Sequence, residues 1–176
     1  MTSSIVKAIW NGKDLVDKAD NSEVFGVILD KTPFYAEAGG QVGDTGHIIQ
    51  DASLGRKAVA GMGGEPPQVS CQFNVEETHR FGEYVLHIGR CGEGLLHCGD
   101  QVTASVQQTN RKLIESNHTS THVLNLALRS VLGDEVGQRG SLVNKDYLRF
   151  DFSHPHALTE DEVSQVETIV NNAIEN

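Results

Sequence analysis

The stretch QVTASVQQTNRKLIESNHTSTHVLNLALRSVLG, residues 101–133, changes its hydrophobic period partway along. Its first six residues alternate polar with apolar side chains, which predicts a half-buried strand. From about residue 110 to 132 the apolar residues recur at helical spacing, and Gly133 follows at the position where helices commonly end. The stretch therefore predicts that a strand-rich half gives way to a helical half near Thr109.

The residues before this boundary contain 15 of the 18 glycines and three of the four prolines. Short apolar runs separated by such turn residues are typical of a small β-barrel. We expect strands at residues 23–30, 45–50 and 83–88, the last of which pairs with residues 95–106 across a glycine-rich turn. Residues 61–67 predict a loop.

The residues after the boundary predict an α+β arrangement. We expect a β-hairpin over residues 140–153, with its turn at residues 144–146 and one apolar face. Thr159 and Glu162 have the spacing of a capping box, so a second helix begins there. That helix reaches residue 176 without a stop signal, and we therefore expect the chain to be cut from a longer protein.

Composition excludes several classes of protein. The chain has 176 residues and a formal net charge of −10, which argues against gripping nucleic acid through bulk positive charge. Its longest apolar runs are far shorter than the roughly 20 residues of a spanning helix, and no secretory signal is visible at the N-terminus. Three cysteines cannot all pair, and nothing else indicates an oxidising compartment. We expect an intracellular protein.

His118 and His122 form the sharpest chemical motif, because two histidines four apart on a helix project one turn apart and can reach one metal ion. Isolated pairs of this spacing are more often plain surface or core histidines. Helical rotation places this pair about 140° from the centre of the apolar arc, which favours a polar cleft wall over the core. The residues of that arc, expected in the core, are Leu113, Leu124, Ala127, Leu128 and Val131.

Zinc needs four ligands, or three and an open position, so the two histidines are not enough. Candidates to complete a site are Cys71, Cys91, Cys98, His87 and His97, although their spacing fits strand alternation equally well.

The sequence TPFYAEAGGQVGDTG, residues 32–46, contains four glycines that allow close approach to another backbone or to a ligand. It lacks the Lys-Ser/Thr ending of a phosphate loop and the order of a dinucleotide fingerprint. Taken alone, it is equally compatible with a bulged turn in a barrel.

Five motifs together resemble, in order and spacing, the editing region of alanyl-tRNA synthetases and of the free-standing AlaX trans-editing proteins. They are residues 32–46, the hairpin around residues 86–100, NHTSTHVL at 117–124, QRGSLV at 138–143 and LRFDFS at 148–153. The resemblance covers about residues 5–176. It implies a glycine-rich β-barrel over residues 1–108 and, over 109–176, the first part of an α+β editing domain similar to that of threonyl-tRNA synthetase.

The resemblance also implies hydrolysis of Ser-tRNA(Ala) and Gly-tRNA(Ala) with the help of zinc. His118 and His122 match the first two zinc ligands, and the family's other Cys and His ligands would lie beyond residue 176. Gln138 and Thr121 match residues of the active-site pocket. Thr32 is the candidate for recognising a serine hydroxyl, with Gly39 and Gly40 beside the substrate. The implied partners are the acceptor end of tRNA(Ala) and an aminoacylation domain, in the cytoplasm and away from membranes.

Alternative readings are a binding module without activity, whose histidines hold no metal, and a free-standing hydrolase of the AlaX type. A metalloprotease is excluded because the motif His-Glu-x-x-His needs Glu at position 119, where this chain has Thr.

Overall fold

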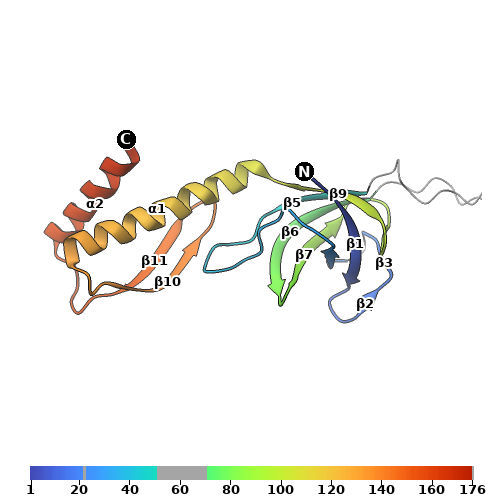
Figure 1. Ribbon diagram of the computed structural model, residues 1–176, viewed down its shortest axis with the longest axis horizontal. Helices are drawn as coiled ribbons and strands as arrows, with labels where there is room; N and C mark the ends of the chain where they lie inside the picture. The colour runs from blue at the N-terminus through green and yellow to red at the C-terminus, as the bar shows by residue number, and fades with distance from the viewer. Residues whose placement is uncertain (22, 51–70, 176) are drawn as a thin grey trace, which may run out of the picture. The chain divides into compact units, whose positions relative to one another are not determined.

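A computed structural model describes residues 1–21, 23–50 and 71–175. The described residues fall into two compact units, the first within residues 1–38 and 43–108 and the second within residues 39–42 and 109–176. The first unit contains strands β1 to β9, and the second contains both helices and the hairpin β10–β11 (Figure 1). The protein is thus of α+β type. The expected loop at residues 61–67 lies outside the described residues.

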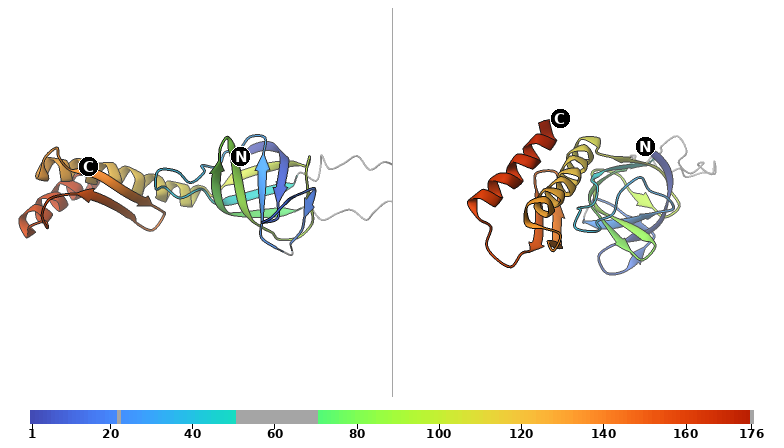
Figure 2. Two further views of the ribbon diagram at one scale, coloured as in Figure 1. Left: turned by 90° about the horizontal axis from the view of Figure 1, so that it is seen from below. Right: turned by 60° about the vertical axis from the view of Figure 1, so that its left-hand side comes forward.

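The first unit is a barrel of antiparallel strands, as the glycine-rich half predicts. Its described strands are β1 (Thr2–Trp10), β2 (Leu15–Val16), β3 (Lys18–Ala19), β4 (Phe25–Leu29), β5 (Gly46–Gln50), β6 (Gln72–Phe81), β7 (Tyr84–Cys91), β8 (Leu96–His97) and β9 (Gln101–Val106). The main sheet has the order β2-β1-β4-β7-β6-β5-β9, and pairing of β1 with β9 closes it. Strands β3 and β8 pair separately. A turned view shows the strands of this unit curving around into a barrel (Figure 2).

One expected strand pairing is wrong. Strand β7 does not pair with residues 95–106; it pairs with β4 and β6, while β9 pairs with β1 and β5. The error arises because β6 was not foreseen, and β6 forms the short hairpin with β7 in which Phe81 faces Tyr84. A two-residue hairpin connection closes at much lower entropic cost than a longer one.

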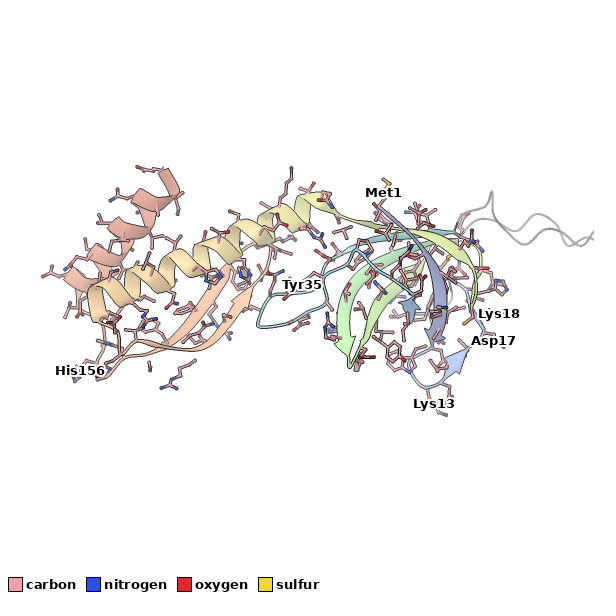
Figure 3. The ribbon with its side chains drawn as sticks, viewed as in Figure 1. Met1, Lys13, Asp17, Lys18, Tyr35 and His156 are labelled. Atoms are coloured by element: carbon pink, nitrogen blue, oxygen red, sulfur yellow. A yellow bond between two sulfur atoms is a disulfide. The ribbon has the colours of Figure 1, made fainter. Side chains whose placement is uncertain are left out.

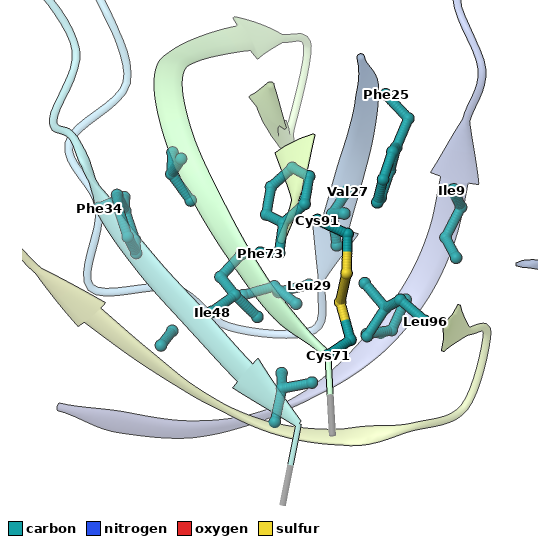
Figure 4. Packing of buried hydrophobic residues seen from close by; sticks show 14 of the residues in the cluster. Ile9, Phe25, Val27, Leu29, Phe34, Ile48, Cys71, Phe73, Cys91 and Leu96 are labelled. Carbon is teal, nitrogen blue, oxygen red and sulfur yellow. A yellow bond between two sulfur atoms is a disulfide. The ribbon is translucent and has the colours of Figure 1, made fainter. Parts of the chain in front are cut away.

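The barrel core follows the alternation of its strands. In β9, for example, Val102, Ala104 and Val106 are buried, as their period of two predicts. The rings of Phe25 and Phe73 lie 4.7 Å apart, and a disulfide joins Cys71 to Cys91 beside them (Figure 4). Burial of these apolar side chains drives the barrel to close. The buried cluster is Val6, Ile9, Phe25, Val27, Leu29, Phe34, Ile48, Cys71, Phe73, Val75, Cys91, Leu96, Val102, Ala104 and Val106.

Most charged side chains of the described barrel residues are exposed, although Asp44 is buried. Lys13, Asp17 and Lys18, near β2 and β3, are all exposed to solvent (Figure 3). No helix of the described residues is both long and apolar enough to cross a membrane.

The second unit contains α1 (Gln108–Leu132), β10 (Gly137–Val143), β11 (Leu148–Ser153) and α2 (Glu160–Glu175). Helix α1 ends where Gly133 adopts a φ of +97° and donates a backbone hydrogen bond to Arg129 O, which confirms the expected stop. The capping box is also present, since Thr159 N–H donates to the Glu162 carboxylate and Glu162 N–H to Thr159 Oγ1.

The core of the second unit joins both helices to the hairpin. Ala127, Leu128, Val136 and Val166 are buried, and partly buried residues such as Phe150 and Phe152 pack against them. Leu113 does not belong to this core, contrary to expectation, because its side chain is 47% exposed. Its neighbour Ile114 is buried instead, so the buried face at the start of α1 is rotated from the arc that the later turns define.

Candidate functional site

Helix α1 brings the imidazoles of His118 and His122 together on its exposed side. Their ring centroids are 5.0 Å apart, with an angle of 46° between the rings. Two imidazoles that bind one tetrahedral zinc ion at about 2.0–2.1 Å have centroids about 5 Å apart by simple geometry. The pair therefore has the spacing of two ligands on a common metal, and neither ring is turned into the hydrophobic core.

The two histidines open onto a cavity of about 140 Å³ within the second unit. Thr121 from the same helix, Gln138 from β10 and Gly39 line it as well, so five of the predicted site residues meet at one place. Asn125 lies one turn beyond Thr121 on the same helix. The complete set of described lining residues is Gly39, Gln41, His118, Thr121, His122, Asn125, Gln138, Ser141, Val143 and Phe150.

The glycine-rich segment reaches this cavity by docking against β10. Val143 N–H donates to Gly40 O at 2.8 Å, and Val42 N–H donates to Val143 O at 3.0 Å, which makes Gln41 and Val143 a parallel bridge. Gly40 has a φ of +86°, and a Cβ atom there would collide with the carbonyl oxygen of Ser141. Only glycine permits this approach. At Gly40 the close approach is therefore to another backbone.

Gln138 on β10 and Thr121 on α1 both contribute polar groups to the lining of the cavity. The β10–β11 register shifts between Gln138 and Gly140, and such bulges redirect neighbouring side chains and often lie beside functional sites. Thr121 is nearly buried, and its hydroxyl donates to Asn117 O at 2.9 Å. Its proton is thus engaged, and its oxygen keeps lone pairs for a ligand.

Thr32 belongs to the first unit and is not among the described residues that line the cavity. Its hydroxyl lies 2.8 Å from Nε2 of His87 and accepts a hydrogen bond from Phe34 N–H. His87 is fully buried, and Nδ1 of its ring lies 2.8 Å from Val27 O. Burial lowers the pKa of His87 below 6.5, and the hydrogen bond to Val27 opposes this only in part.

The cysteine and histidine candidates for completing a metal site lie elsewhere in the first unit. Cys71 is paired with Cys91, Cys98 Sγ contacts Val16 O at 3.5 Å, and His97 Nδ1 lies 3.6 Å from Asp100. Among residues 1–21, 23–50 and 71–175, no cluster of three or more His, Cys, Asp or Glu is placed to hold a metal ion. Within these residues the pair of His118 and His122 lacks the third and fourth ligands that a zinc site requires.

The cavity also contains residues that the sequence analysis did not single out, notably Gln41, Ser141 and Phe150. Gln41 directly follows the Gly39-Gly40 pair, and an amide beside two adjacent glycines is a signal that would have identified it. Ser141 and Phe150 carry no such signal, because their role depends on the hairpin register, in which they face each other.

Comparison with known proteins identifies the family of the chain. The family of class II (A) tRNA synthetases matches residues 1–110. Similar proteins include the alanine–tRNA ligase of Candida albicans, 42% identical over 172 residues, and the cytoplasmic alanine–tRNA ligase of Dictyostelium discoideum, 42% identical over 177 residues. The alanine–tRNA ligase of Leptospira biflexa is 39% identical over 172 residues.

These alignments cover 97%, 97% and 98% of the chain, but only 16%, 17% and 17% of the relatives. The chain therefore corresponds to about one sixth of the length of the ligases it matches.

Proposed function

Since the chain belongs to the family of class II (A) tRNA synthetases and matches a segment of alanine–tRNA ligases, we propose that it removes wrong amino acids from tRNA(Ala). The reaction is hydrolysis of an ester: water cleaves the bond between serine or glycine and the 3′ end of the tRNA. The observation that carries the proposal is the cavity shared by His118, His122, Thr121 and Gln138. In this view the second unit is the first part of an editing domain of the threonyl/alanyl type.

A hydrolytic site of this kind compensates for the limited selectivity of the aminoacylation site. A pocket shaped for alanine excludes larger side chains but discriminates poorly against glycine, and serine differs from alanine by only one hydroxyl. Discrimination of this kind often reaches only about a hundredfold, and a second, hydrolytic site then removes the errors. A small cavity in the second unit, whose lining includes the polar side chains of Thr121 and Gln138, suits a small aminoacyl group.

The polar groups of the cavity have complementary roles in this proposal. The oxygen of the buried Thr121 and the exposed amide of Gln138 orient the amino acid through hydrogen bonds, and a substrate that leaves the buried group unpaired binds less well. His118 and His122 supply two neutral nitrogen ligands, and a Cys and a His from beyond residue 176 would complete the set. Zinc held there would supply Lewis-acid chemistry at the ester carbonyl or at a water molecule.

The proposed partners follow from the same assignment. They are the acceptor end of tRNA(Ala) carrying serine or glycine, and an aminoacylation domain that makes the error, in the cytoplasm. Because the net charge of this chain is −10, its contacts with tRNA are confined to a local surface and do not depend on bulk positive charge.

The test is the double variant His118→Ala/His122→Ala in a complete alanine–tRNA ligase that contains this chain. We expect release of serine from Ser-tRNA(Ala) to fall to the background rate, while charging with alanine is unchanged. The matched control is His154→Ala/His156→Ala, a second histidine pair of the same unit whose members do not line the cavity.

Three results would contradict the proposal. Serine release that survives the double variant would remove the histidines from the reaction. Loss of alanine charging as well would make them structural. A complete wild-type ligase that binds Ser-tRNA(Ala) but releases no serine would show a binding module instead.

A further inference from the structure

The side chain of Gln41 binds the ring of His118. Oε1 of the amide lies 2.7 Å from Nδ1 of the imidazole, and both residues belong to the second unit. An amide oxygen only accepts hydrogen bonds, so Nδ1 carries the proton of this contact. In a neutral imidazole the other nitrogen, Nε2, then holds the lone pair.

We propose that Gln41 is a positioning residue that keeps the proton of His118 on Nδ1 and so presents the Nε2 lone pair to the cavity. The partner of that lone pair is a divalent metal ion. This last step rests on the proposed function; the choice of tautomer does not. Residues that bind the second nitrogen of a metal-binding histidine commonly fix both its tautomer and its ring orientation.

The backbone holds Gln41 in place independently of its side chain. Hydrogen bonds to Val143 lie on both sides of it, from Val143 N–H to Gly40 O and from Val42 N–H to Val143 O. Ser141 Oγ adds a hydrogen bond to Gly39 O at 3.2 Å. The side chain of Gln41 can therefore be changed while these backbone contacts keep the segment on β10.

This arrangement explains why Gly39 and Gly40 precede Gln41. Gly40 allows the backbone to approach β10 where a side chain would collide with Ser141. Gln41, the next residue, then projects from this fixed backbone toward His118 on α1, which lies one turn before His122. Because the His118 and His122 rings already lie 5.0 Å apart, fixing one ring also defines where a shared ligand lies.

The first experiment reads the tautomer directly. The metal-free chain, with ¹⁵N-labelled histidine, is examined by long-range ¹H–¹⁵N NMR at about pH 8.5, roughly two units above the ordinary histidine pKa. The His118 signals are assigned from their loss in His118→Gln. We expect the Nδ1–H form in the wild type and a shift toward the Nε2–H form in Gln41→Leu.

Two further variants separate the hydrogen bond from general effects. Gln41→Glu keeps an acceptor at Nδ1 and should preserve the Nδ1–H form. Gln165→Leu, which alters an exposed glutamine on α2, should change nothing at His118. In uniformly ¹⁵N-labelled samples the amide signal of Val143, which donates to Gly40 O, should stay in place in every variant, which shows that the segment remains docked.

The second experiment measures the affinity of the complete ligase for Zn²⁺ and Co²⁺. Loss of a hydrogen-bonding partner behind a ligating histidine typically weakens metal binding about 10- to 100-fold, and we expect that loss in Gln41→Leu, with Gln41→Glu close to the wild type.

Two tautomer results would overturn the inference: the Nε2–H form of His118 in the wild type, or an unchanged Nδ1–H form in Gln41→Leu. Unchanged metal affinity in Gln41→Leu would overturn its metal-binding step. Failure of the proposed editing function would appear separately, as serine release that survives loss of both histidines.

Discussion

In the first unit, the Thr32 hydroxyl lies 2.8 Å from Nε2 of the buried His87. The direction of each hydrogen bond follows from the partners. Val27 O can only accept, so Nδ1 of His87 donates to it, and the neutral ring must accept at Nε2. Thr32 therefore donates its proton to His87 while Phe34 N–H donates to Thr32. One lone pair of Thr32 remains, so toward a serine hydroxyl it can act only as an acceptor.

Replacing Thr32 tests this bond. Thr32→Val removes the only described donor to Nε2 of a buried imidazole, and an unsatisfied buried acceptor costs about 1–3 kcal/mol. We expect the free energy of unfolding, measured by urea titration, to fall by that amount. Thr32→Ser retains the hydroxyl and should fall by much less. Equal losses in the two variants would show that the hydroxyl of Thr32 contributes no more to stability than its methyl group does.

The buried His87 should also make stability depend on pH. Its pKa is lowered by burial in the folded state, so the unfolded chain binds more protons between the folded pKa and about 6.5. Its contribution to stability is complete above pH 6.5 and is lost as the pH falls through the folded pKa. The slope for one proton cannot exceed about 1.4 kcal/mol per pH unit.

The measurement is a series of urea titrations between pH 8 and pH 5 on the wild type and His87→Gln. The variant loses stability at every pH, but its curve should be flatter below pH 6.5. Parallel curves would mean that other groups cause the pH dependence.

Gly40 and Gly39 provide a matched pair of substitutions. Both have positive φ, +86° and +59°, but only Gly40 lacks room for a side chain. Gly39→Ala should cost about 1–2 kcal/mol from backbone strain alone. Gly40→Ala adds a collision with β10, and crowding of this kind costs about 1–3 kcal/mol more. It should also separate Gln41 from His118, which the histidine NMR signals would reveal. Similar stabilities for the two variants would contradict the docked arrangement.

Gln138 is predicted to act on the substrate and not on packing, because its side chain is exposed and faces the cavity. Gln138→His should slow serine release by about tenfold, the equivalent of one hydrogen bond, with little change in melting temperature. Its exposed neighbour Arg139 does not line the described cavity, so Arg139→Gln is the control. A large fall in melting temperature for Gln138→His would assign it a packing role.

The capping box at the start of α2 should contribute to stability. Thr159→Ala removes the side-chain cap and should lower the free energy of unfolding by about 1 kcal/mol. Thr168→Ala, which deletes a hydroxyl in the middle of the same helix, should have a smaller effect. Thermal melting followed by circular dichroism distinguishes the two. Equal melting temperatures of the two variants would show that the Thr159 cap contributes no more to stability than a hydroxyl in the middle of the helix.

The same box should weaken in acid. Hydrogen bonds from the backbone and hydroxyl of Thr159 lower the pKa of Glu162, so its contribution is present above about pH 4.5 and is lost as the pH falls through the lowered value. Below that point the difference between Thr159→Ala and the wild type should narrow to the contribution of the hydrogen bond from Glu162 N–H to Thr159 Oγ1, which urea titrations of both proteins at neutral and acid pH would measure.

Local sequence patterns predicted many of the strands, helix ends and caps because interactions between residues close in the sequence decide these features. The alternation in residues 101–106, the glycine after Leu132 and the Thr159–Glu162 box each involve residues a few positions apart, and the structure contains all three. Pairing of distant strands was harder. The expected partner of β7 was wrong because alternation identifies a strand without identifying its neighbour, and a missed strand changes every assignment around it.

For the candidate site, the sequence by itself determined that His118, Thr121 and His122 lie along one helix, because helical geometry sets that spacing whatever the rest of the chain does. Only the tertiary structure decided that Gln138 faces them and that Gln41 binds His118. Those contacts join residues 77 positions apart in the case of Gln41. The contact of Gln41 with His118 depends on the docking of the Gly40 backbone against β10, which no local pattern encodes. The missing side chain of Gly40 affects the structure only because β10 lies against it.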